Sequence, residues 1–480
     1  MRVQAIDHAA MLPLYLASAA AVLALFAGRL AKAAAMAGLA AAAVAAVAVG
    51  LGPDRATFAV GDWHSYVADD AAMGAAALFA GLAVLVAALS GRQTGEYWFL
   101  LTASAAGGIA LAGARDLITL LVAVETLTLP LYVLVARPGR DGAEAGTTFL
   151  IASVTSSATA LMGAALLYAA SGTVHLAGLG PGLGGAHPGL TAAGAALLLS
   201  GLAFKLAAAP LHAWAPLVLE RAPLPVATYL ASASKLGGAV AVTWVVFFGL
   251  SDVASAGLVI AVLSVASIAV GNLGALVQRR TVPLLAWSGV AHAGYALAPL
   301  AVIMTAAGRE QAGPAASAAF AYAVFFVLLE AGAFAALTAV RPAAGSVLAE
   351  GTPADRAGGH GPGGRIAELA GLWKAAPLPA AVLLFSVVGL AGLPPALAGT
   401  FAKVAVLEVL ASSAVWLAVV VAAGAVVGLA YYLPLARALL IGRAGPAPRR
   451  YAVAVALAGL AVAAVSLAPQ VVLDFTELSR

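Results

Sequence analysis

Long apolar runs separated by short polar stretches follow one another along the whole chain. Most runs have about twenty residues, the length that a helix needs to cross the hydrocarbon core of a bilayer. The chain is therefore expected to be an all-α polytopic membrane protein. The pattern predicts about 14 transmembrane helices, near residues 9–28, 33–51, 71–90, 97–114, 117–136, 147–171, 190–213, 225–249, 253–277, 281–303, 315–340, 377–412, 413–440 and 452–472.

Basic residues are distributed unevenly between the two sets of predicted loops. With the N-terminus outside, sixteen of the 24 Lys and Arg residues fall in inside loops, five in outside loops and three within spans. Cytoplasmic loops carry the excess of Lys and Arg, so both termini are expected outside. The inside loop 341–376 is predicted to be a solvated linker that closes with a short interfacial helix. The Gly-rich outer stretch 172–189 is predicted to be a flexible connector.

Composition excludes several classes of protein. With 63% apolar and 9% charged residues, the chain cannot be an ordinary soluble domain. The net charge of +4 comes from scattered residues with no basic stripe, so no nucleic-acid partner is expected. The chain has no cysteine, which excludes disulfides, thiolate metal sites and iron–sulfur clusters held by this chain. No cofactor or metal site is expected in it.

Two lysines within apolar segments mark the stretch 201–238, GLAFKLAAAPLHAWAPLVLERAPLPVATYLASASKLGG. Four prolines break the chain between Lys205 and Lys235. A lysine at bilayer depth costs roughly 3 kcal/mol or more, so each needs a partner or water. Snorkelling to the interface is the alternative, but about ten mostly uncharged residues flank Lys235 on each side. These lysines are therefore predicted to form a functional ionisable site.

Other titratable residues within the predicted spans are Glu125, His292, Glu330, Lys403 and Glu408. A lone buried carboxylate or lysine tends to be neutral, whereas a facing pair can stay ionised. A Glu–Lys pair that opens and closes would load and release a proton; a static pair that fixes helix register is the alternative. Histidine, with an ordinary pKa of about 6.5, suits a proton relay. A histidine bonded to a neighbouring carbonyl is the alternative for His292.

A second helix break is predicted at 389–399, just before Lys403. Broken helices in two comparable positions indicate inverted repeats with an ion path at the breaks. The predicted organisation places three helices in 1–96, a first repeat in 97–249, a second repeat in 253–440 and a last helix in 452–480.

Together these motifs resemble a known family. FKLAAAPLHAWAP followed by RAPLPVATYLASASKLGG, with Glu125 upstream, SGVAHAGY downstream and GLPP ahead of a lysine, is similar to the antiporter-like membrane subunits of respiratory complex I, the NADH–quinone oxidoreductase. The resemblance covers roughly residues 95–440. Within the family it favours subunit N, because subunit M usually carries glutamate at the position of Lys403. Subunit L is disfavoured because no long lateral helix follows residue 472.

The resemblance implies a fold of fourteen helices with two inverted five-helix repeats, each with a broken helix. It implies that Glu125 and Lys205 form the ion pair at the proton input, that Lys235 and His292 form the middle of a polar axis, and that Lys403 exchanges protons with the outside. Protons would move along this axis, driven by quinone reduction in partner subunits. Glu330 and Glu408 are not expected from the family and are possible accessory residues. Either could be a partner of Lys403 or a protonated, structural group.

The resemblance also implies the setting of the chain. Other membrane and peripheral subunits of complex I would be its partners, in a bacterial inner membrane. NADH, flavin, iron–sulfur clusters and quinone would be bound by those other subunits. This chain would carry no bond chemistry of its own and would act as a non-redox subunit of a proton-pumping translocase.

Two positions depart from the family pattern. Leu217 follows Pro216 where the family usually has aspartate, and ALAGTFAK is one residue longer than the usual run before the lysine. One extra residue turns a wound helix by about 100°, which leaves the direction of Lys403 open. Two alternatives remain. The large subunit of a multisubunit cation/proton antiporter shares this fold and these lysines, and the longer run before Lys403 leaves open a mainly structural copy whose axis is broken there.

Overall fold

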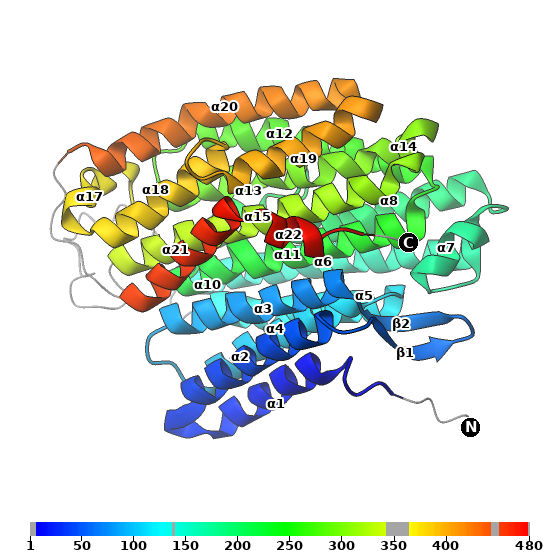
Figure 1. Ribbon diagram of the computed structural model, residues 1–480, viewed down its shortest axis with the longest axis horizontal. Helices are drawn as coiled ribbons and strands as arrows, with labels where there is room; N and C mark the ends of the chain where they lie inside the picture. The colour runs from blue at the N-terminus through cyan, green and yellow to red at the C-terminus, as the bar shows by residue number, and fades with distance from the viewer. Residues whose placement is uncertain (1–5, 137–139, 342–363, 443–450, 479–480) are drawn as a thin grey trace.

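The computed structural model describes residues 6–136, 140–341, 364–442 and 451–478, and the chain forms a bundle of roughly aligned helices (Figure 1). The helices are α1 (Leu12–Phe26), α2 (Ala31–Gly50), α3 (Asp70–Leu89), α4 (Gly95–Gly113), α5 (Leu117–Val135), α6 (Arg140–Ser171), α7 (Leu176–Leu183), α8 (Pro188–Lys205), α9 (Trp214–Arg221), α10 (Leu224–Tyr229), α11 (Lys235–Trp244), α12 (Ala254–Leu276), α13 (Thr281–Leu297), α14 (Ala306–Glu310), α15 (Ala312–Val340), α17 (Leu372–Ala375), α18 (Pro377–Ala391), α19 (Ala398–Ser413), α20 (Val415–Leu440), α21 (Ala452–Leu467) and α22 (Gln470–Phe475). Short 3-10 segments cover Gly28–Leu30, Ala298–Met304 and Ile366–Leu369, and π-helical turns cover Leu230–Ser234 and Val245–Leu250.

The helices have the length and polarity of membrane spans. Within the described residues, ten of them are long and apolar enough to cross a bilayer, and α1, α18 and α21 are shorter apolar helices of 15, 15 and 16 residues. Large apolar side chains on the outer helices are exposed, as on a surface that faces lipid; Leu23, Leu273 and Leu460 are 62%, 66% and 65% exposed. The prediction of a polytopic helical membrane protein is confirmed.

Three segments form the centre of the bundle. About nine-tenths of each of the helical stretches 224–250, 281–304 and 312–340 is buried, whereas only about a third of α20 and of the stretch 28–50 is buried. An apolar helix that is buried all round needs no polar face, so charged residues within it are unusual. These same three stretches carry Lys235, His292 and Glu330.

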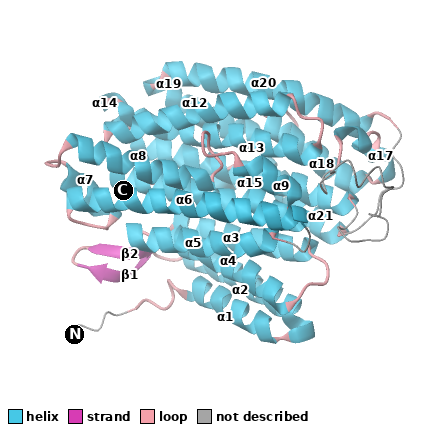
Figure 2. Cartoon of the chain, turned by 180° about the vertical axis from the view of Figure 1, so that it is seen from behind, coloured by secondary structure: helices cyan, strands magenta, loops and turns pink. Residues whose placement is uncertain are grey.

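A β-hairpin that the hydropathy pattern did not predict follows α2. Strands β1 (Arg55–Val60) and β2 (Trp63–Ala68) pair antiparallel, with Val60 opposite Trp63, and Figure 2 shows them at one end of the helical bundle. Gly61 adopts a positive φ of 61° in the turn, a conformation that glycine adopts without strain. The hairpin lies between the second and third spans that the hydropathy pattern predicts, at 33–51 and 71–90.

The Gly-rich stretch 172–189 is not simply a flexible connector, because it contains α7. Leu176, Leu179 and Leu183 are buried at helical spacing, and Gly249 lies against Leu179. The buried leucine face supplies the packing that outweighs the low helix propensity of the glycines. The start of α1, the hairpin, α7 and the C-terminal end lie at the same end of the molecule, opposite α17 (Figure 1).

Part of the predicted linker 341–376 lies outside the described residues, at 342–363. Its described end contains the 3-10 segment Ile366–Leu369 and the single turn of α17. Arg341 anchors this end through an ion pair with Glu368, with Nη1 2.6 Å from a carboxylate oxygen. The short closing helix expected from the sequence is thus split into two turns around Gly371, whose φ is +74°.

Candidate functional site

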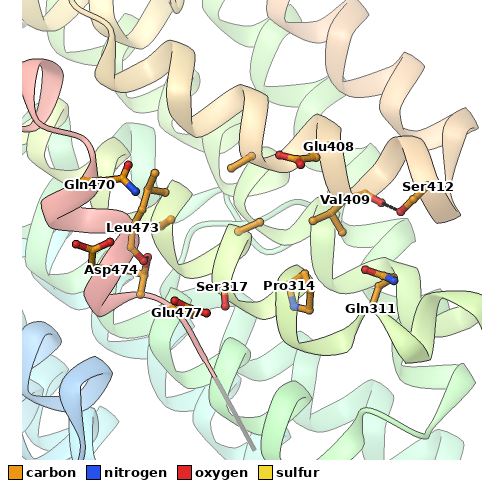
Figure 3. Close-up of a pocket in the computed structure, with 14 residues that line it drawn as sticks. Gln311, Pro314, Ser317, Glu408, Val409, Ser412, Gln470, Leu473, Asp474 and Glu477 are labelled. Carbon is orange, nitrogen blue, oxygen red and sulfur yellow. Dashed lines mark hydrogen bonds between the residues drawn. The ribbon is translucent and has the colours of Figure 1, made fainter.

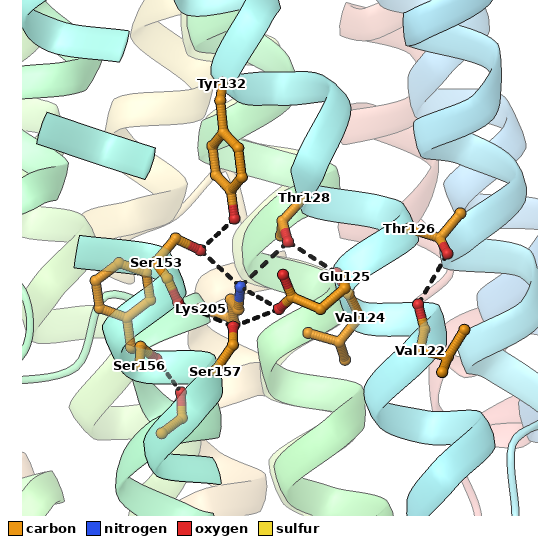
Figure 4. Close-up of polar contacts among 12 residues, drawn as sticks. Val122, Val124, Glu125, Thr126, Thr128, Tyr132, Ser153, Ser156, Ser157 and Lys205 are labelled. Atoms are coloured by element: carbon orange, nitrogen blue, oxygen red, sulfur yellow. Dashed lines mark hydrogen bonds and ion pairs between the residues drawn. The ribbon is translucent and has the colours of Figure 1, made fainter. Parts of the chain in front are cut away.

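Lys205, the last residue of α8, lies in a cluster of polar side chains from α5 and α6 (Figure 4). Its Nζ donates hydrogen bonds to Glu125 Oε1 at 2.8 Å, Ser153 Oγ at 2.7 Å and Thr128 Oγ1 at 3.1 Å. The Ser157 hydroxyl donates to the same Glu125 oxygen. The lysine side chain is 3% exposed and the glutamate 34%. Each of the three N–H groups of the ammonium therefore has an acceptor.

The helix break positions this lysine. After Lys205 the chain leaves α8 in a series of turns and resumes as α9, and Ala207 has a positive φ of 62°. The carbonyl end of a helix carries a partial negative charge that favours a cation. Gly238 of α11 allows close packing here, because a Cβ at this position would lie 2.7 Å from the carbonyl carbon of Lys205. The first two lysine-bearing segments are thus in direct contact.

Lys235 forms a second ion pair, with Glu330 of α15. Its Nζ lies 2.8 Å and 3.1 Å from the two carboxylate oxygens, and both side chains are fully buried. The lysine follows the π-helical turn Leu230–Ser234, an irregularity often found at functional sites. Gly289 of α13 leaves the space for the pair, since a Cβ there would lie within 2.9 Å of Glu330 Oε1. The sequence did not identify Glu330 as the partner of Lys235.

His292 of α13 has a hydroxyl on each ring nitrogen. Tyr322 OH lies 2.8 Å from Nδ1 and Tyr432 OH lies 3.1 Å from Nε2. The ring also stacks on Phe326 at a centroid distance of 4.8 Å. Its partners are therefore hydroxyls and not the neighbouring carbonyl of the alternative interpretation. Because a phenol both donates and accepts, this arrangement suits either neutral tautomer.

Lys403 turns back toward the second break. Its Nζ donates to the carbonyl oxygens of Leu390 and Ala391, at 3.0 Å and 2.7 Å, which are the last residues of α18. Gly392 follows them with a φ of +81°, and a Cβ at this position would lie 2.6 Å from the lysine amine. The longer run before Lys403 therefore still directs the amine to the break. Lys205 and Lys403 each lie at the carbonyl end of a broken helix.

A small cavity lies between His292 and Lys403. It offers about 10 Å³ to the centre of a water molecule, the room for about one water. Tyr322, Phe326 and Leu329 of α15 also line it. The histidine and the lysine thus share one enclosed space.

Glu408 lies apart from these clusters. It is exposed and lines an outer cavity of about 550 Å³ between α15, α19 and α22, together with Asp474 and Glu477 (Figure 3). Five residues separate Glu408 from Lys403 on α19, which points the two side chains about 140° apart. Glu408 is therefore not a partner of Lys403.

Five of the predicted residues follow one another through the bundle. Glu125 pairs with Lys205, and α11, which begins at Lys235, packs on the backbone of Lys205 through Gly238. The ring of Phe326 lies next to both Lys235 and His292, and the small cavity lies between His292 and Lys403. The residues that sequence reasoning missed are the hydroxyl partners Ser153, Tyr322 and Tyr432, whose positions depend on helix packing. Among the described residues no group of three His, Asp or Glu side chains could hold a metal ion.

Comparisons with known proteins agree with this architecture. A relative from Salinispora tropica named NADH-quinone oxidoreductase subunit N is 46% identical over 461 residues, covering 91% of this chain and 86% of its own length. A chain in the structure of respiratory complex I from Thermus thermophilus with bound aureothin superposes with a TM-score of 0.79 at 29% identity, covering 97% of this chain and 98% of its own. A chain of the Mrp complex from a Dietzia species has the same fold, with a TM-score of 0.81 at 21% identity over 98% of this chain and 97% of its own.

A family model also matches most of the chain. Residues 114–428 match the family described as NADH:quinone oxidoreductase/Mrp antiporter, TM. That range contains both broken helices and all four residues of the two ion pairs. The chain therefore belongs to the family of membrane subunits shared by NADH:quinone oxidoreductases and Mrp antiporters.

Proposed function

We propose that this chain is the proton-translocating subunit N of an NADH–quinone oxidoreductase. The observation that carries the proposal is the series of buried titratable groups across the central helices. Glu125 with Lys205 starts the series, Lys235 and His292 continue it, and Lys403 ends it. Charged groups inside a membrane protein mark ion paths, because they are costly to bury. The 46% identity to a relative named subunit N supports this choice within the family.

The proposed topology has fourteen spans with both termini outside. The ten long apolar helices, α1, α4, the broken pair α18 and α19, and α21 together make fourteen. Residues 1–96 form the first three spans, 97–249 and 253–440 form two inverted five-helix repeats, and 452–480 carries the last span. The two lysines at the carbonyl ends of broken helices support this division, since each repeat then has one break and one lysine.

The proposed setting is a bacterial inner membrane, within a complex of membrane and peripheral subunits. Redox cofactors (NADH, flavin, iron–sulfur clusters and quinone) would be bound by those other subunits, since this chain has no cysteine. The chain then contributes no bond chemistry of its own. Its part in the enzyme is to move protons.

The proposed mechanism is electrostatic. Quinone reduction in partner subunits changes the charge near Glu125, and the contact between Glu125 and Lys205 opens or closes in response. A proton then moves from Lys205 to the central pair of Lys235, on to His292, and through the small cavity to Lys403. The tyrosine hydroxyls on His292 give the ring hydrogen-bonded partners on both sides, as a relay needs.

Replacement of the central lysine tests the path. Lys235→Ala should abolish the proton pumping that depends on this chain, because Lys235 is the lysine that pairs with Glu330 in the described part of the chain. The purified complex, reconstituted in vesicles, would be compared with the wild type for protons moved per electron and for subunit content. An unchanged proton-to-electron ratio in a fully assembled variant would exclude the path.

The antiporter alternative makes a different prediction about partners. The chain would be tagged at its C-terminus and purified gently from native membranes. Iron–sulfur and quinone-reducing subunits in the preparation are expected from the proposal. Small membrane subunits without redox partners, with sodium- or potassium-dependent proton flux in the absence of NADH, would instead establish a cation/proton antiporter.

A further inference from the structure

One face of α15 contacts two of the titratable groups of the proposed path and approaches the third. Tyr322, Phe326 and Glu330 are spaced four residues apart, so their side chains lie along the same face of the helix. Tyr322 bonds to His292, and Phe326 stacks on His292 while its ring centroid lies 5.1 Å from Lys235 Nζ. Leu329, beside Glu330, lines the cavity that reaches Lys403. The carboxylate of Glu330 therefore begins a row of contacts that continues through Phe326 and His292 to the cavity beside Lys403.

The two ion pairs differ in what holds the lysine. Lys205 has three oxygen acceptors from three different side chains, and its carboxylate partner Glu125 is one-third exposed. Among the described residues, the hydrogen bonds of Lys235 go to the two oxygens of Glu330 alone. Both members of this second pair are fully buried. The charge of Lys235 thus depends on one carboxylate.

In a lysine–glutamate ion pair, only the carboxylate can accept an additional proton. The ammonium of lysine has three N–H donors and no lone pair, whereas a carboxylate has two oxygens with about four acceptor positions. Lys235 occupies one position on each oxygen of Glu330, which leaves further lone pairs free. A proton that reaches the intact pair can bind only to the glutamate.

We infer that Glu330 is the proton-loading group of the central pair, an inference that rests on the proposed path. In the resting pair Lys235 is an ammonium and Glu330 a carboxylate, with no net charge. An incoming proton forms an O–H bond on Glu330, and the pair becomes an ammonium beside a neutral carboxylic acid, with one positive charge. Loss of that proton to the neutral imidazole of His292 restores the resting pair and forms an imidazolium.

The surroundings of Glu330 fit this role. Glu330 binds Lys235 on α11, and the ring of Phe326 lies next to both Lys235 and His292 on α13. Two tyrosine hydroxyls bond to His292, from Tyr322 on α15 and Tyr432 on α20. Lys235 is the positive group that binds the carboxylate of Glu330. His292 is the nearby base, and its ring stacks on Phe326, which lies on the same face of α15 as Glu330. Gly289 is the residue of α13 that faces the pair, and it has no side chain. His292 is therefore the base that a proton leaving Glu330 meets on the way to Lys403.

The test uses the assembled complex and the isosteric variant Glu330→Gln. The amide keeps an oxygen for Lys235 but cannot bind a proton, so the pair is held in the charge of the loaded state. Pumping per electron should fall as far as in Lys235→Ala, with electron transfer from NADH to quinone retained. Glu310→Gln is the matched control, because Glu310 is an exposed acid at the end of α14 and should leave pumping unchanged.

Infrared difference spectroscopy separates proton loading from a purely structural role. During turnover the wild-type complex should show the carbonyl stretch of a protonated carboxylic acid that shifts in deuterated water, and Glu330→Gln should lack it. If Glu330→Gln does not assemble, Glu330→Asp keeps the acid and should move that band in frequency. A wild-type complex without such a band, or a variant that keeps it unchanged, would overturn the inference.

The outcomes distinguish this inference from the proposed function. Loss of pumping in Lys235→Ala with full pumping in Glu330→Gln would reject Glu330 as the loading group and leave the path intact. Full pumping in both variants would reject the path itself. Loss of pumping in both, together with loss of the infrared band, supports both.

Discussion

Gly289→Ala tests the central ion pair without altering either charged residue. The glycine lies in α13 against the Lys235–Glu330 pair, and an added Cβ would lie 2.9 Å from Glu330 Oε1 and closer still to Lys235 Nζ. Ordinary van der Waals contact begins at 3.4 Å. The lysine amine is the end of a flexible side chain, so it should move by about 1 Å or more while the helices stay in place.

The size of the effect follows from the separation of the charges. The ammonium and the carboxylate now lie 2.8 Å apart. At an effective dielectric constant of about 20, widening that distance to about 4 Å weakens their attraction by about 2 kcal/mol, or more than tenfold in an equilibrium constant. Alanine is the better helix former by about 1 kcal/mol, which offsets part of the loss in the stability of the fold. Proton transfer should therefore suffer more than assembly.

The assay compares Gly289→Ala with a glycine that has free space. Gly81 in α3 has nothing within 4 Å of a built Cβ, so Gly81→Ala should assemble and pump as the wild type does. Gly289→Ala should assemble to the same level as the wild type. Its proton-to-electron ratio should fall most of the way to the ratio of Lys235→Ala. Normal pumping in Gly289→Ala, with a structure in which the pair keeps its 2.8 Å contact, would refute the reasoning.

Two further predictions concern the second break and the outer end of the bundle. Gly392→Ala should destabilise the fold by about 1–2 kcal/mol because φ is +81°, and should displace Lys403, whose amine lies 2.6 Å from the added Cβ; thermal unfolding and pumping of the complex would measure both. The backbone N–H of Ala10 and the side chain of Arg55 lower the pKa of Asp7 from 3.8, so its contribution to holding the N-terminal segment on the hairpin should be complete above about pH 4 and lost as pH falls through the lowered pKa. The protection factors of the Ala9 and Ala10 amides, measured by hydrogen exchange and corrected for the intrinsic pH dependence of the exchange rate, should fall over this range. Protection factors that stay constant between pH 5 and pH 2 would contradict the prediction.

The helices and both breaks could be predicted from the sequence, because each rests on a local rule. An apolar run of about twenty residues is enough to predict a span, and prolines near Lys205 and Lys403 are enough to predict an interruption. The hairpin at 55–68 also had a local signal in the turn at Gly61, but the hydropathy pattern does not detect short strands outside the membrane. The helix α7 was missed because its leucines, Leu176, Leu179 and Leu183, are few and lie among glycines.

The partners of the charges could not be predicted from local rules. Glu330 and Lys235 are 95 residues apart, and their contact depends on how α11, α13 and α15 pack. One signal was available: a glutamate deep within the 29-residue apolar helix α15 must find a cation or become neutral. The direction of Lys403 was open for a similar reason, because it depends on the left-handed turn at Gly392 rather than on helical spacing.

The three lysines differ in how strongly their surroundings support a positive charge, and this difference gives the proposed path a direction. Lys205 has a carboxylate and two hydroxyls, Lys235 has a carboxylate alone, and Lys403 has two backbone carbonyls. A full negative charge stabilises an ammonium more than carbonyl dipoles do, so support for the charge falls from the first lysine to the last. Among the described residues, the hydrogen bonds of Lys403 go to backbone carbonyls and not to a carboxylate, which suits the exit role proposed for it. If Glu330 also loads the proton in the middle, each forward step moves it from a site next to a carboxylate toward a site without one.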